Sequence, residues 1–170
     1  MPVIVIHQPK PPTGAPDATP QEIAQICRLP NVHAYIMGLE YRTEALAAAL
    51  LPDTCELWGC NGSLCAASGL LGATGACCFF AIWAAPLIRR IVQLAMDGEH
   101  SLARAEQSKL YAADYLGMTL GTPALKAGLQ LLGYSSMRPR KPQLPVVGEK
   151  LNELMEAMVQ AGVLQESPKL

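Results

Sequence analysis

Short runs of β-branched and other apolar residues alternate with longer segments that favour helices, and this order restricts the fold more than any other feature. The strand-like runs cover residues 2–6, 32–37, 55–59 and 75–81. Helix-forming segments separate them at 19–29, 41–51 and 63–72. The first begins with Thr19 and Glu22 at the spacing of a capping box, and the third ends at Gly72. Strands that are joined through helices usually form parallel sheets with right-handed crossovers. The sequence therefore predicts an α/β fold built on a parallel sheet.

The remainder of the chain is predicted to be helical. Helices are expected over 85–99, 101–117, 122–133 and 148–161, each with a glycine near its end. We expect 1–99 to form four βα units and 100–170 to form a helical segment of the same domain. Four such units are half of a TIM (β/α)8 barrel, and a small open doubly wound sheet is the alternative. No GxGxxG or P-loop motif follows a strand, so a nucleotide-binding sheet lacks support.

A long uncharged stretch raises the alternative of a membrane span. No charged residue occurs from Leu57 to Ile88, and this length is sufficient to cross a bilayer. However, glycines and Asn61 divide the stretch, and buried parallel strands are equally free of charge. We therefore expect no membrane association.

Charge and cysteine content exclude several classes of protein. The net charge is -1, so no overall basic field favours nucleic acid, and the short basic run at 138–142 is read as a loop. The N-terminal residues lack the pattern of a signal peptide. The 6 cysteines are expected to be free thiols in a reducing, cytoplasmic setting. Their spacing does not predict a zinc site, and we expect no metal.

Four stretches, taken in order, resemble one enzyme family. They are "PVIVIHQPKPPTG", "LPNVHAYIMG", "LLPDTCELWGCNGSLCAASGLLGATGACCFFA" and "TPALKAGLQLLGY…MRPRKPQLPV". Together they resemble the C-terminal half of the dihydrodipicolinate synthase / N-acetylneuraminate lyase family, whose members are pyruvate-handling Schiff-base lyases on a TIM barrel. The resemblance implies half of such a barrel, a 2-oxo acid as the ligand, and no cofactor.

The resemblance also assigns positions to a substrate pocket. The family's proton-relaying tyrosine falls on Ile6 and its Schiff-base lysine on Ile36. The other pocket positions that it implies are His7, Thr13, Gly14, Gly59 and Cys77.

Isoleucine at the lysine and tyrosine positions removes the family's chemistry. A Schiff base needs an amine nucleophile, and isoleucine transfers no proton. The resemblance thus implies a non-catalytic or partner-dependent member. The partner is expected to be a second copy or another chain that completes the barrel, because a half-barrel has open sheet edges. Two alternatives remain: an active lyase or aldolase in a complex, using a partner's residues or Lys10, and a decayed copy without a function of its own.

Overall fold

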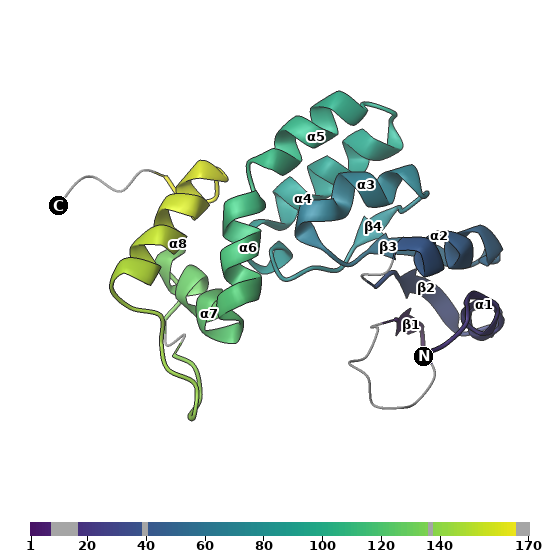
Figure 1. The fold of residues 1–170 in the computed structure, drawn as a ribbon, viewed down its shortest axis with the longest axis horizontal. Coiled ribbons are helices and arrows are strands. Elements are labelled where there is room, and N and C mark those ends of the chain that lie inside the picture. Colours follow the sequence, from purple (N-terminus) through teal and green to yellow (C-terminus); the bar gives the residue numbers. More distant parts are fainter. Residues whose placement is uncertain (8–16, 39–40, 136–137, 166–170) are drawn as a thin grey trace.

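The sheet has the predicted parallel order. The computed structural model describes residues 1–7, 17–38, 41–135 and 138–165. Its strands are β1 (Val3–Ile6), β2 (Val32–Ile36), β3 (Glu56–Gly59) and β4 (Gly75–Ala76). They form one 4-stranded sheet in the order β1-β2-β3-β4, and every pairing is parallel. Helices join each strand to the next, so the α/β fold predicted from the sequence is confirmed (Figure 1).

The helices follow the predicted order with some changes of boundary. They are α1 (Pro20–Cys27), α2 (Tyr41–Leu50), α3 (Cys65–Leu70), α4 (Ala81–Met96), α5 (His100–Ser108), α6 (Tyr111–Leu120), α7 (Thr122–Leu131) and α8 (Glu149–Gln160). A short 3-10 helix, Gly62–Leu64, precedes α3. Helix α1 begins with the predicted capping box, in which Thr19 and Glu22 bond to each other's backbone N–H groups.

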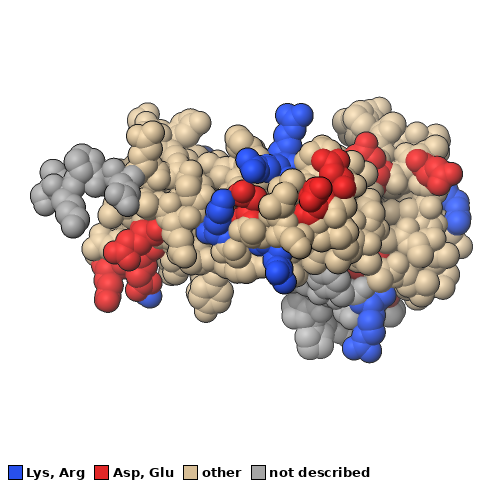
Figure 2. Space-filling model, turned by 90° about the horizontal axis from the view of Figure 1, so that it is seen from above, with Lys and Arg blue, Asp and Glu red and all other residues tan. Residues whose placement is uncertain are grey.

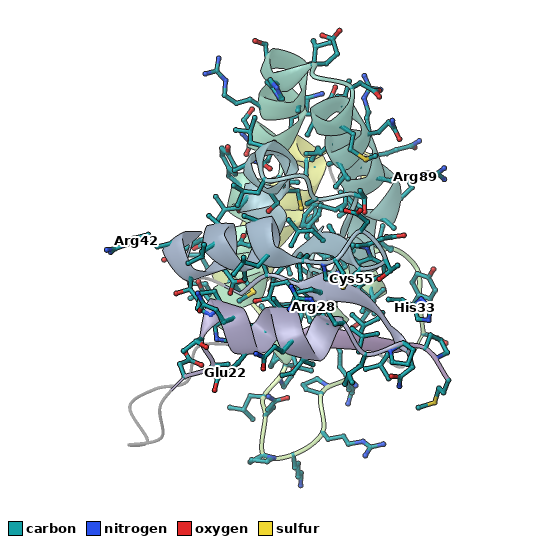
Figure 3. All side chains as sticks on the ribbon, turned by 90° about the vertical axis from the view of Figure 1, so that its right-hand side faces the viewer. Glu22, Arg28, His33, Arg42, Cys55 and Arg89 are labelled. Atoms are coloured by element: carbon teal, nitrogen blue, oxygen red, sulfur yellow. The ribbon has the colours of Figure 1, made fainter. Side chains whose placement is uncertain are left out.

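The two faces of the sheet have different surroundings. Val5, Tyr35 and Leu57 are neighbours in register and pack with α1 and α2 in one apolar cluster. Figure 3 shows these two helices in front of the strands. Ile6, Ile36 and Trp58 are also neighbours in register, and they point to the opposite face because side chains alternate along a strand. We call this second surface the inner face.

The uncharged stretch from Leu57 to Ile88 is folded into several short elements. It contains most of β3, the 3-10 helix, α3, β4 and the first half of α4. Its lack of charge is explained by this packing, since Leu57, Cys65, Phe80 and Ile88 are all buried. Within the described residues, no helix has the length and apolar character needed to cross a bilayer.

The C-terminal helices form a second apolar cluster around Trp83. Its indole N–H donates to the carbonyl of Leu125 at 3.0 Å. The ring lies against two helical glycines: a Cβ on Gly128 would be 2.4 Å from the indole Nε1, and one on Gly117 would be 3.1 Å from Cη2. These glycines let α6 and α7 approach the ring of α4.

Three predicted boundaries were wrong. The strand expected over 75–81 ends at Ala76, because the following residues turn into α4, which begins at Ala81. The helix expected over 101–117 is two helices, α5 and α6, which meet at Leu110. Gly117 does not end a helix; the stop is Gly121, whose φ of 65° is available to glycine at little cost.

Charged side chains are dispersed over the surface. On the face in Figure 2, acidic and basic groups are interspersed among a larger uncharged area. This view agrees with the small net charge of -1 and shows no continuous basic surface on that side of the described chain.

Candidate functional site

A row of side chains crosses the inner face near the carboxyl ends of the strands. In register, the row runs Ile6, Ile36, Trp58 and Gly75. A Cβ on Gly75 would be 2.9 Å from the indole Nε1 of Trp58, so the ring lies over this glycine. Ile36 is buried, whereas Ile6 at the sheet edge keeps 47% of its surface exposed. The inner face is therefore apolar and only partly covered by this chain.

A carboxylate borders this row. Glu56 accepts hydrogen bonds from the Trp58 indole N–H at 2.7 Å and from the Thr74 hydroxyl at 3.2 Å. Both bonds are exposed, and they fix the orientation of the indole rather than leaving the carboxylate free for acid–base work.

A hydrogen-bonded cluster lies behind the row, on the helix side of the sheet. His7 follows Ile6 and therefore points away from the inner face. Its Nδ1 is 2.7 Å from Oε1 of Glu44, and its Nε2 is 2.9 Å from Oδ1 of Asp17. Glu44, in the first turn of α2, is fully buried and also accepts from the Tyr35 hydroxyl and from the Gly38 N–H at 2.9 Å. We call His7, Asp17, Tyr35 and Glu44 the His7 cluster.

The two carboxylates favour a charged His7. Burial alone lowers the pKa of the imidazole, but the hydrogen bonds to Asp17 and Glu44 outweigh it and raise the pKa above 6.5. Both partners only accept hydrogen bonds, so both ring nitrogens are satisfied when the imidazolium donates twice. Burial and the neighbouring Glu44 raise the pKa of the Tyr35 hydroxyl, which keeps it a donor.

The ends of β3 and β4 carry the other predicted site positions. Gly59 is the last residue of β3, and its carbonyl accepts from the Cys77 N–H at 2.7 Å. The Cys77 side chain is exposed. Gly59 has no room for a side chain, because a Cβ would be 2.8 Å from the Ser68 hydroxyl.

The structure brings some predicted residues together and separates others. Ile6 and Ile36 are direct neighbours, and Gly59 adjoins Cys77. His7 lies on the opposite side of the sheet from the Ile6 side chain. Thr13 and Gly14, like Lys10, lie outside the described residues. No group of His, Cys, Asp or Glu in the described part of the chain is arranged to hold a metal ion.

Glu44 is the member of the His7 cluster that sequence reasoning missed. It stands in an alanine-rich helix, where a glutamate is usually a solvated helix former. The one sequence signal that pointed to a buried polar partner was His7, because a residue directly after a strand lies near the helices that cover the sheet.

Comparison with known proteins gives the family. The model of the dihydrodipicolinate synthetase family matches residues 1–161. The chain belongs to this family. Its curated relatives include a 4-hydroxy-tetrahydrodipicolinate synthase of Synechococcus elongatus, 26% identical over 147 residues. That alignment covers 85% of this chain and 49% of the relative, so the chain spans about half the length of the curated relatives it matches.

Solved structures of the dihydrodipicolinate synthetase family share the fold. A dihydrodipicolinate synthase of Cyanidioschyzon merolae with lysine bound superposes with a TM-score of 0.84 at 20% identity, over 96% of this chain and 56% of that one. The enzyme of Thermotoga maritima gives 0.82 at 19% identity, over 96% and 57%. The four βα units and the helices after them thus correspond to half of the barrel proteins of this family.

Proposed function

We propose that this chain is a member of the dihydrodipicolinate synthetase family that performs no Schiff-base chemistry by itself and acts by completing a barrel with a second chain. The observation that carries this proposal is the pairing of Ile6 with Ile36 on the inner face. The family resemblance assigns a tyrosine and a lysine to these two positions. Neither isoleucine forms a covalent bond to a carbonyl group or moves a proton.

The described lysines offer no replacement. Lys109, at the C-terminal end of α5, has its Nζ 2.7 Å from a carboxylate oxygen of Glu106. Lys150, on α8, has its Nζ 2.7 Å from a carboxylate oxygen of Glu153. Lys126 donates to the backbone carbonyl of Arg138 at 3.1 Å, which ties α7 to the following loop. These three and the exposed Lys141, the fourth described lysine, all belong to the C-terminal helical segment, and none lies on the sheet.

The sheet supports the requirement for a second chain. Among the described strands, β1 and β4 each pair on one side only. The β1 edge exposes Ile4 and Ile6 on the inner face, with 48% and 47% of their surfaces accessible. Unpaired strand edges and partly exposed apolar faces favour association. A second chain that adds βα units at these edges would pair with the unpaired strands and would also cover the apolar inner face.

Trapping with pyruvate tests the catalytic part of this proposal. The full chain is incubated with pyruvate and borohydride, alone and in cell lysate, and analysed by mass spectrometry, with a lysine-bearing member of the family as positive control. We expect no adduct on this chain. An adduct on a co-purifying protein would support a partner that carries the chemistry. An adduct on Lys10 would refute the proposal and establish an active lyase or aldolase instead.

Sedimentation tests the association. We expect Ile4→Asp to shift the chain, alone or with its partner, to a lower mass. Leu102→Asp is a matched control, because Leu102 is 54% exposed and lies on α5, away from the sheet edge. A wild-type chain that remains a cooperatively folding monomer, and that recovers no partner from lysate, would refute this part.

A further inference from the structure

A cavity lies between α3, with the 3-10 helix before it, and the helices α5 and α6. Its volume is about 420 Å³, within the usual range of small-molecule sites. Helices α3 and α5 contact each other, and Figure 1 shows them side by side. A Cβ on Gly59 would meet Ser68 of α3, and Gly59 alternates with the inner-face Trp58, so α3 packs on the opposite side of the sheet. The cavity is therefore separate from the inner face.

One wall of this cavity is apolar. It is formed by Leu64, at the end of the 3-10 helix, and by Ala66, Ala67 and Leu70 of α3. These residues recur at the three- and four-residue spacing that places side chains on one face of a helix. Leu70 keeps 66% of its surface exposed, so contact with an aliphatic group would remove apolar surface from water.

The opposite wall carries hydrogen-bond donors. His100, Ser101 and Arg104 lie on one face of α5 and line the cavity. Within the described residues, the Arg104 guanidinium forms no hydrogen bond and no ion pair. Its N–H groups are therefore available to a ligand, and their planar arrangement suits the two oxygens of a carboxylate.

A buried hydrogen-bond chain fixes a second donor, the hydroxyl of Tyr111. Gln107 is 4% exposed, and its side-chain carbonyl accepts from the Ala66 N–H at 2.6 Å. The Gln107 amide nitrogen then donates to the Tyr111 hydroxyl oxygen at 3.3 Å. Because that oxygen accepts this bond, the hydroxyl proton needs another acceptor, and no residue of the described chain supplies one. Tyr111 begins α6 and lines the cavity, so its proton is available to a ligand there.

The charged groups that line the cavity are basic. Among the described residues, no aspartate or glutamate belongs to the lining. Glu106, on α5, pairs with Lys109 at 2.7 Å. Asp114, on α6, lies against the wall of the cavity, where its carboxylate accepts from both the N–H and the hydroxyl of Ser63. A ligand in the cavity thus meets a positive charge and hydroxyl donors on one side and an apolar wall on the other.

We propose that this cavity binds a small aliphatic carboxylate, with its carboxylate on Arg104 and Tyr111 and its chain on the α3 wall. Donors without acceptors select an anion, and a guanidinium binds a carboxylate through paired hydrogen bonds. The apolar wall selects an anion that has an aliphatic part over an inorganic anion. The site is independent of the inner face, so the proposed function and this proposal can fail separately.

Titration calorimetry of the full chain with hexanoate at low salt tests the class of ligand. We expect saturable binding of hexanoate. Acetate lacks the chain, hexanol lacks the charge and hexylammonium has the opposite charge, so each should bind at least about tenfold more weakly. Failure of hexanoate to bind saturably would overturn the proposal, and so would equal binding of hexanol or of inorganic phosphate.

Variants locate the site on the chain. Arg104→Gln should weaken hexanoate binding about tenfold, because the charge and the paired donors are lost. Tyr111→Phe should weaken it about threefold, since one neutral donor is lost. Arg89→Gln is the matched control and should change nothing, because Arg89 does not line the cavity and points away from the chain in Figure 3. Circular dichroism checks that each variant is folded. Hexanoate binding that Arg104→Gln leaves unchanged, as a site on the inner face would give, would overturn the proposal.

Discussion

Replacement of Glu44 should be the most damaging single change in the sheet half of the molecule. Its buried carboxylate accepts from Tyr35, His7 and Gly38. Glu44→Ala leaves all three donors without an acceptor, at about 1–3 kcal/mol for each buried group. Since part of this cost is recovered by relaxation, we expect a loss of about 3–5 kcal/mol, the usual cost of breaking a buried ion pair.

Glu44→Gln removes the negative charge of the side chain while keeping its size and shape. The amide oxygen retains one acceptor, but the amide N–H₂ replaces the other carboxylate oxygen and faces a donor. We expect a smaller loss, of about 1–3 kcal/mol. Glu153→Gln is the matched control on α8, because the Glu153–Lys150 pair is solvent-exposed and such pairs contribute little to stability.

Urea unfolding followed by circular dichroism measures these differences. With a slope of about 2 kcal/mol per molar urea, the Glu44→Ala midpoint should fall by about 2 M. A double-mutant cycle with His7→Ala should give a coupling of about 0.5–3 kcal/mol, since the two side chains are in contact. An unchanged midpoint for Glu44→Ala, or strictly additive effects, would refute the reasoning.

Two further outcomes follow from the described contacts. The pKa of His7 is raised above 6.5 in the folded chain, so its stabilising contribution is complete below about pH 6.5 and is lost as the pH rises through the folded value. The free energy of unfolding should therefore fall over this range in wild type and fall less in His7→Gln, as measured by urea titrations at several pH values; equal slopes would contradict the assignment. Gly128→Ala should lower the free energy of unfolding by about 1–3 kcal/mol, and Gly117→Ala should lower it less, because a Cβ on Gly128 would lie closer to Trp83 than one on Gly117. Thermal unfolding with equal midpoints for these two variants would contradict that packing.

Local sequence signals predicted most elements of the fold. β-Branched runs and helix-length segments located three strands within a residue or two of their ends. The Thr19–Glu22 capping box located the start of α1 because its two hydrogen bonds depend on residues three apart. Gly72, Gly98, Gly133 and Gly162 all have positive φ at the expected stops. These features depend on residues close together in the sequence and can therefore be predicted from it.

The errors arose where distant contacts decide the structure. Gly117 resembles a helix stop, yet Trp83, far earlier in the chain, needs its small size within α6. Phe80 resembles a strand residue, but it packs edge-on with Trp83, at a centroid distance of 5.8 Å, in the turn that leads into α4. In the candidate site, the family resemblance assigned Ile6 and Ile36 to one pocket, whereas their pairing and the burial of Glu44 required the fold itself.

The positions of the two tryptophans allow fluorescence to show whether the inner face is covered. Trp83 is 7% exposed inside the C-terminal cluster, while Trp58 lies on the partly open inner face. Emission from Trp83 should therefore be blue-shifted in the isolated chain, and Trp58 should emit at longer wavelength. Any chain that covers the inner face would move only the Trp58 emission, so a Trp83→Phe variant would give an optical titration of that surface without a label.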